Sequence, residues 1–279
     1  VMRIRNLYYN HEFSYDEINC MIEGVLACKT ISSMDAQHLI EKIENNLTAK
    51  YYPKGPKQIC KVQEPPLVDR ELLRNNLLTL QKAIDRGVQV AFHFNGYSKD
   101  KKLVPIRKEK DMVSPYYIVA NGGRYYLLAC MDRYFGSEKK HNMTIWRIDL
   151  MTNIEIPGTN EKLGIKGIPI VPKRDVENLP LQWSEDFQLK HLNMAFDKPE
   201  WITLRIKGVE RKNPNNNERA DLTFLHDWFG DNFRYVRVES ETPHYDIVQV
   251  ECSPYAMVNW ALQYSDRVEV LEPEHVRED

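Results

Sequence analysis

Residues 88–94 read VQVAFHF, residues 113–119 read VSPYYIV, residues 124–130 read RYYLLAC and residues 144–149 read TIWRID. These four runs are rich in Val, Ile, Phe and Tyr and are separated by Gly, Asn, Pro, Lys and Asp, which is the pattern of an antiparallel meander. The sequence Asn121-Gly122-Gly123 offers residues that accept positive φ, so it is the clearest hairpin turn in the chain. We therefore expect a small, strongly curved sheet or barrel of roughly seventy residues.

A helix is predicted immediately before this sheet, over residues 69–86. Apolar positions recur along it at helical spacing, and Gly87 stands where a helix C-terminus is favoured. The expected buried face consists of Leu72, Leu73, Asn76, Leu77, Leu80 and Ile84. Because the helix runs directly into the first strand, we expect it to cover the open end of the barrel.

Residues 1–66 are expected to hold a helical hairpin followed by a linker. Ser14 is predicted to cap a first helix, with acidic residues in its first turn, and Ser32 or Ser33 is predicted to cap a second. Each helix carries one apolar stripe, which serves either as core or as a dimer face. The Pro-rich stretch from Tyr51 to Pro66 is then a linker or a surface loop.

Two further segments follow the barrel, which together with its preceding helix is placed at residues 67–157. Residues 158–200 are rich in Pro, Gly and Lys, and are predicted to be a linker with one short helix over 184–194. Residues 201–279 have the order βαββαβ of a ferredoxin-like domain. Its strands are expected at 201–206, 233–238, 245–250 and 267–271. The predicted fold class is α+β.

The composition is that of an ordinary soluble globular protein, with 42% hydrophobic and 28% charged residues. The formal net charge of −2 excludes a uniformly basic nucleic-acid protein, so any anion site must be local. The five cysteines form no Cys-x-x-Cys motif, which favours reduced thiols in a cytoplasmic protein over a disulfide scaffold or a zinc site. No apolar run approaches the roughly twenty residues of a membrane span, and no signal-peptide pattern is found.

Motifs for catalysis are missing from the sequence. It contains no Gly-x-Ser-x-Gly, no His-Glu-x-x-His, no Walker loop and no Gly-x-Gly-x-x-Gly. The eight histidines are dispersed, and none has metal-ligand spacing to another His or Cys. We therefore predict no catalytic residue, no metal and no cofactor, and keep an unrecognised hydrolase as a third hypothesis.

The order of the barrel motifs resembles that of the WYL domain, which is named for a tryptophan-tyrosine-leucine strand. The corresponding strand here reads Tyr125-Tyr126-Leu127, after Phe92-His93-Phe94 and Ser114-Pro115-Tyr116 and before Trp146-Arg147-Ile148-Asp149. WYL proteins are mostly bacterial transcription regulators with an N-terminal winged helix-turn-helix, an Sm-like WYL barrel and a C-terminal extension called WCX. The resemblance implies the end of a winged-helix region at the start of residues 1–66, an Sm-like barrel at 67–157, a WCX-type domain at 201–279 and DNA-reading helices upstream of residue 1.

The residues of the barrel themselves favour a local nucleic-acid site. Basic residues cluster after the first strand, at Lys99, Lys101, Lys102, Arg107, Lys108 and Lys110. Basic residues interleaved with aromatic strands suit backbone phosphates and base stacking. Since only alternate residues of a strand share a face, either Tyr116 or Tyr117 can point at a ligand, but not both. The alternative is a solvated lysine loop beside an aromatic core.

The resemblance assigns the anion contact to the last of the four strands, where the WYL pattern has arginines. Only the central arginine is present here, as Arg147, whereas the flanking positions are Thr144 and Leu150. A planar guanidinium suits a phosphate, although Arg147 could instead pair with a nearby acid. The expected ligand-binding residues are Arg147, Tyr116, Tyr125, Ser114, Tyr97, His141 and Arg107, with Lys101, Lys102 and Lys140 steering the phosphates.

The favoured function is the effector-sensing and dimerising portion of a DNA-binding transcription regulator, whose barrel binds an anionic ligand such as a single-stranded nucleic acid or a nucleotide. The implied partners are promoter DNA through the missing N-terminal head, a single-stranded oligonucleotide as effector, and a second copy in a homodimer, with no membrane. Ligand binding would shift the population between dimer arrangements. Because Thr144 and Leu150 stand where arginines are expected, the alternative is a structural dimerisation module that needs no ligand.

Overall fold

The computed structural model describes residues 12–48, 61, 69–135, 138–208, 221–241 and 243–278. The chain divides into two compact units, which we describe separately. The first consists of Val1–Leu128 with Trp146–Ile170, and the second of Ala129–Ile145 with Val171–Asp279. In the described part of the chain, no helix is long and apolar enough to cross a membrane.

The predicted helical hairpin is confirmed as α1 (Tyr15–Ala27) and α2 (Ser33–Leu47). Ser14 and Glu17 form a capping box, in which the Glu17 amide donates to Ser14 Oγ (3.3 Å) and the Ser14 amide donates to Glu17 Oε2 (2.7 Å). Ile18 of α1 is buried and packs with apolar residues of both helices. The two apolar stripes therefore face each other as core.

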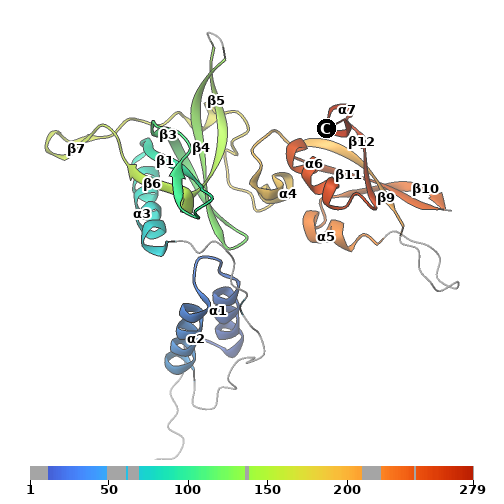
Figure 1. Cartoon of the computed structure of the whole chain (residues 1–279), viewed down its shortest axis with the longest axis horizontal. Helices are drawn as coiled ribbons and strands as arrows, with labels where there is room; N and C mark the ends of the chain where they lie inside the picture. The colour runs from blue at the N-terminus through green and yellow to red at the C-terminus, as the bar shows by residue number, and fades with distance from the viewer. Residues whose placement is uncertain are drawn as a thin grey trace, which may run out of the picture. The chain divides into compact units, whose positions relative to one another are not determined.

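Helix α3 (Arg70–Arg86) precedes the sheet and matches the prediction of residues 69–86 to within one residue, since Asp69 is its N-cap. The Asp69 side chain accepts from the Leu72 amide (3.0 Å), and Gly87 ends the helix with φ +65°. Its buried residues are Leu73, Asn76, Leu80 and Ala83. The helix packs on β3, β6 and the turn between β5 and β6, so it covers the curled sheet as expected (Figure 1).

The sheet contains six strands in the part of the chain that is described: β1 (Val90–Tyr97), β2 (Leu103–Pro105), β3 (Asp111–Asn121), β4 (Arg124–Phe135), β5 (Glu138–Arg147) and β6 (Met151–Glu155). The strand order is β2-β1-β3-β4-β5, and β6 pairs antiparallel with the other edge of β1, which curls the sheet into an open antiparallel barrel. The predicted turn is confirmed, since Gly122 (φ +53°) and Gly123 (φ +73°) have the positive φ of a type I′ hairpin.

Strands β2 and β6 were not among the four predicted runs. Strand β2 has three residues within a lysine-rich segment and ends at Pro105, so it carries too little alternation to be detected. Strand β6 follows a single 3-10 turn, Ile148–Leu150, which connects it to β5. The turn carries the buried residue Asp149.

Short elements occupy the segment after the barrel. They are β7 (Thr159–Asn160), β8 (Ile165–Lys166), the 3-10 turns Glu161–Leu163, Lys173–Asp175 and Leu192–Met194, and helix α4 (Phe187–Lys190). The predicted helix over 184–194 is therefore one turn of α-helix followed by a 3-10 turn. Leu192 is buried in the core of the C-terminal domain, so the end of this segment packs with that domain.

The C-terminal domain has the predicted ferredoxin-like order. Its elements are β9 (Glu200–Lys207), α5 (Thr223–Phe229), β10 (Arg234–Glu241), β11 (His244–Cys252), α6 (Pro254–Gln263), β12 (Val268–Glu272) and a short α7 (Glu274–Arg277). The sheet order is β10-β11-β9-β12, all antiparallel. Ser253 caps α6 as predicted, because its Oγ accepts from the Ala256 amide (3.2 Å).

Candidate ligand-binding site

Arg147 ends strand β5 and is held by a carboxylate two residues later. Its Nε donates to Asp149 Oδ1 (3.2 Å) and its Nη2 donates to Asp149 Oδ2 (2.6 Å). The Asp149 side chain is only 4% exposed, whereas that of Arg147 is 30% exposed. This bidentate pair fixes the plane of the guanidinium and leaves part of it at the surface.

A second arginine approaches the same carboxylate from strand β4. Arg124 Nη1 lies 3.5 Å from Asp149 Oδ2, and the Arg124 side chain is 14% exposed. Two guanidinium groups thus share one carboxylate, so the cluster carries one excess positive charge. Such a partly buried excess charge creates a local positive potential in a chain whose overall formal charge is −2.

Two tyrosines lie near Arg147. Burial lowers the pKa of Arg147, but the hydrogen bond and charge of Asp149, with smaller contributions from Tyr126 and Tyr97, outweigh it and raise the pKa above its ordinary value. Arg124 and Tyr126 are alternate residues of β4 and share a face. Tyr97, at the end of β1, is 40% exposed. The arginine therefore remains charged, within electrostatic range of both phenol groups.

Two buried asparagines hold the 3-10 turn that carries Asp149. From α3, Asn76 Nδ2 donates to the carbonyls of Ile148 (3.0 Å) and Met151 (2.8 Å). From β1, Asn95 Nδ2 donates to the carbonyl of Leu150 (2.8 Å). These bonds satisfy buried carbonyl groups and fix the turn to the helix on one side and the sheet on the other.

The aromatic residue next to Arg147 serves the core. Trp146 is 7% exposed and makes edge-to-face contacts with Phe92 (5.3 Å between ring centroids) and Phe94 (4.9 Å). Because neighbouring residues of a strand point to opposite faces, burial of Trp146 turns Arg147 to the other side. The packing of Trp146 in the core thus orients the Arg147 side chain.

Two of the predicted steering residues, Lys101 and Lys102, lie between β1 and β2, and the predicted ligand-binding residue Arg107 follows β2. Lys101 and Lys102 are exposed. Arg107 forms an ion pair with Asp111, whose side chain is 5% exposed. Tyr97 ends the strand that leads into this loop, so the structure brings Tyr97 into the surroundings of Arg147 with lysines following in sequence.

The remaining predicted site residues lie elsewhere. Ser114 and Tyr116 are buried at 1% and 4% exposure, and Ser114 Oγ accepts from Gln89 Nε2 (3.4 Å). Tyr125 lies on the opposite face of β4 from Tyr126 and lines a groove beside α3. His141 is half-buried on β5, in the part of that strand that belongs to the second unit. The side chain of Lys140 lies outside the described residues.

Sequence reasoning missed four residues that build the site: Arg124, Asp149, Asn76 and Asn95. The spacing Arg124-x-Tyr126 was a usable signal, since a strand brings both side chains to one face. The sequence contains no comparable signal for the two asparagines, because their hydrogen-bond partners lie 55 to 75 residues away in the chain. In the described part of the chain, no three His, Cys, Asp or Glu side chains gather closely enough to hold a metal ion.

Residues 75–156, which include most of α3 and all six strands, match the WYL domain. This segment is a WYL domain. The curled sheet, the covering helix and the Arg147 cluster therefore all belong to one recognised domain, as the order of its motifs had suggested. No curated protein sequence matches the chain.

Among solved structures, the chain is similar to proteasome accessory factor B/C (PafBC) of Arthrobacter aurescens. The two share 12% identity at a TM-score of 0.30, over 95% of this chain and 34% of that one. It is also similar to a CRISPR Cas-related protein, with 13% identity and a TM-score of 0.37 over 74% of this chain and 49% of that one. The chain thus spans between a third and a half of the length of these two proteins.

Proposed function

We propose that this chain is the effector-sensing portion of a cytoplasmic DNA-binding transcription regulator, and that the surface around Arg147 in its WYL domain binds a phosphate of single-stranded nucleic acid. The single observation that carries this proposal is the geometry of the Arg147–Asp149 pair. Two of the five N–H donors of the guanidinium are engaged by Asp149, which leaves three that no described residue occupies. Asp149 therefore orients the Arg147 guanidinium and leaves N–H donors available for a ligand.

The surroundings of Arg147 suit a nucleotide chain. Tyr97 and Tyr126 offer rings for stacking or hydroxyl groups for hydrogen bonds, and the excess charge of the two-arginine cluster favours a phosphate. Lys101 and Lys102 add exposed positive charge on the loop after Tyr97, which raises the rate of association rather than the specificity. Binding at this surface would bias the arrangement of two protomers in a homodimer, and through them promoter DNA.

A second candidate function is a dimerisation module that binds no ligand. It is favoured by the same ion pair, because Arg147 already has a carboxylate partner, and by the burial of Thr144 and Leu150 at the positions where the WYL pattern has arginines. The two functions differ in one respect: the first requires saturable binding of a polyanion at Arg147, and the second predicts dimerisation with no such binding.

Fluorescence anisotropy of a labelled oligothymidylate of roughly twelve nucleotides tests the proposal. We expect saturable binding that weakens between about 50 and 300 mM salt, and about tenfold weaker binding of Arg147→Gln, equivalent to ~1.4 kcal/mol. Arg86→Gln is the matched control, because Arg86 is an exposed arginine at the end of α3. Equal affinities for the Arg147→Gln and Arg86→Gln proteins, or no binding at low salt, would leave the dimerisation module as the better account.

A further inference from the structure

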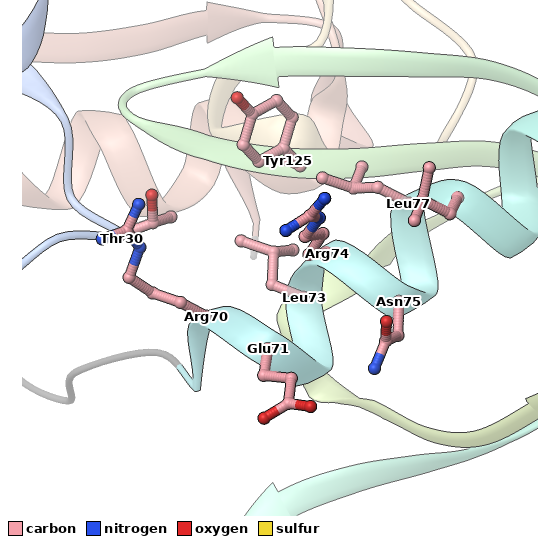
Figure 2. A pocket seen from close by; sticks show the side chains of 9 residues that line it. Thr30, Arg70, Glu71, Leu73, Arg74, Asn75, Leu77 and Tyr125 are labelled. Carbon is pink, nitrogen blue, oxygen red and sulfur yellow. The ribbon is translucent and has the colours of Figure 1, made fainter.

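A concave surface lies beside α3 and includes Tyr125 of β4. It is an open groove of about 850 Å³, lined by Thr30, Arg70, Glu71, Leu73, Arg74, Asn75, Leu77, Leu78 and Tyr125. Figure 2 shows the Arg74 guanidinium lying under the Tyr125 ring and the Arg70 side chain extending toward Thr30. Tyr125 and Tyr126 are neighbours on a strand, so they face different surfaces.

The groove is positively charged where it is open. Arg70 and Arg74 stand four residues apart and therefore occupy one side of the helix. In the part of the chain that the structure describes, neither guanidinium is engaged in an ion pair. Glu71 also lines the groove, and in Figure 2 its carboxylate points away from both guanidiniums. Two cations without a carboxylate partner create a local positive potential that an anion can neutralise.

Three leucines and the Tyr125 ring form the apolar part of the lining, which also includes the polar residues Thr30, Glu71 and Asn75. Leu73 is buried at 5% exposure and forms part of the floor, while Leu78 is 60% exposed at the rim. Tyr125 contributes a ring and a hydroxyl group, and Thr30 a second hydroxyl group. A mostly apolar lining with a few convergent polar groups is the usual constitution of a small-molecule site, and the volume lies in the range of such sites.

We propose that this groove binds a small organic anion, in which an apolar body packs on Leu73, Leu77 and Tyr125 and a phosphate or carboxylate group bridges Arg70 and Arg74. The apolar wall accounts for the body and the pair of guanidiniums for the charge. Arginine suits either anionic group because its planar fork donates two parallel hydrogen bonds. The site is independent of the function proposed for Arg147, because it uses different residues on another face of the domain.

Titration of the full chain with phenyl phosphate, benzoate or inorganic phosphate, followed by amide chemical shifts of α3 and β4, tests this proposal. We expect phenyl phosphate or benzoate to shift residues around Tyr125 saturably, with dissociation constants of roughly 1 mM or less. Whichever of phenyl phosphate and benzoate binds more tightly shows whether the groove prefers a phosphate or a carboxylate group. Inorganic phosphate, which has no apolar body, should bind at least about fivefold more weakly than phenyl phosphate.

Arg74→Gln should weaken binding of the aromatic anion about fivefold or more, whereas Arg86→Gln, at the far end of the same helix, should leave it unchanged. Circular dichroism would verify that both variants are folded. The proposal is overturned if neither aromatic anion produces saturable shifts near Tyr125, if inorganic phosphate binds as tightly as phenyl phosphate, or if Arg74→Gln and wild type bind equally. Loss of oligonucleotide binding in Arg147→Gln with retained phenyl phosphate binding would separate the two sites.

Discussion

Arg147 donates two hydrogen bonds to Asp149, through Nε to Oδ1 and through Nη2 to Oδ2, and Asp149 is nearly inaccessible to solvent while Arg147 is not. A buried carboxylate that orients a partly exposed guanidinium is an arrangement for presenting positive charge in one direction. It depends on a 3-10 turn that brings residue 149 back beneath residue 147. The stability of that turn is therefore the first property to test.

Replacement of Asn76 by leucine should destabilise the WYL domain by about 2–4 kcal/mol, because it removes the Nδ2 group that donates to two buried carbonyl groups and leaves the Ile148 carbonyl with only the Met151 amide. The neighbouring Asn75 is exposed on the same helix, so Asn75→Leu should change the free energy of unfolding by no more than ~0.5 kcal/mol. Urea denaturation of both variants measures the difference. Equal stabilities would show that the turn is held by other contacts.

Gly87 and Gly24 should respond in opposite ways to alanine. Gly87 ends α3 with φ +65°, so Gly87→Ala should destabilise by about 1 kcal/mol even though nothing lies within 4 Å of the added Cβ. Gly24 lies inside α1 without positive φ and also has open space, so Gly24→Ala should stabilise α1 by about 0.5–1 kcal/mol. Thermal melts of the two variants test the signs, and a stabilised Gly87→Ala protein would contradict the left-handed cap.

Acid should destabilise the C-terminal unit through His191. Burial lowers the pKa of His191, and the hydrogen bond between Nδ1 and the Ala195 carbonyl (2.8 Å) offsets this only in part. Since the unfolded chain takes up the proton more readily, the stability contributed by the neutral ring is complete above about pH 6.5 and is lost as the pH falls below it. His191→Gln should show a shallower fall of melting temperature between about pH 7 and pH 5. An unchanged slope would assign the acid sensitivity to other groups.

The cysteines should differ in reactivity. Burial raises the pKa of Cys252 to about 12, and the side chain is inaccessible, whereas Cys20 is exposed on α1. Because the thiolate is the reactive form, a thiol reagent at neutral pH should modify Cys20 rapidly and Cys252 only after unfolding. Mass spectrometry of peptides after a brief treatment measures this. Early modification of Cys252 would mean that the core of the C-terminal domain opens readily.

Local signals in the sequence sufficed for the helices and for the central hairpin. Ser14, Asp69 and Gly87 act within one turn of themselves, and the pair Gly122-Gly123 defines its own turn, so these boundaries could be predicted without tertiary information. The α+β class and the ferredoxin-like order followed from periodicity for the same reason. Strand β6 was not predicted because it is defined by its pairing with β1 and not by its own composition.

The site was less accessible to prediction than the fold. Arg147 could be identified from the resemblance, but its pairing with Asp149 depends on a turn that Asn76 and Asn95 hold from distant parts of the chain. Alternation established that Tyr125 and Tyr126 face opposite sides without establishing which of them faces Arg147. That choice follows from the curl of the sheet, which the residues of β4 alone do not determine.

The most direct test of the central claim is the side-chain Nε–Hε resonance of Arg147 in a ¹H–¹⁵N correlation spectrum, followed during titration with the oligothymidylate and assigned by its disappearance in Arg147→Gln. The claim that Asp149 presents Arg147 to a phosphate predicts a saturable shift of this resonance, with the same dissociation constant as the anisotropy titration, while Arg86 stays unchanged. An Arg147 resonance that does not move while oligonucleotide binds would contradict it, because the polyanion would then be held elsewhere on the chain.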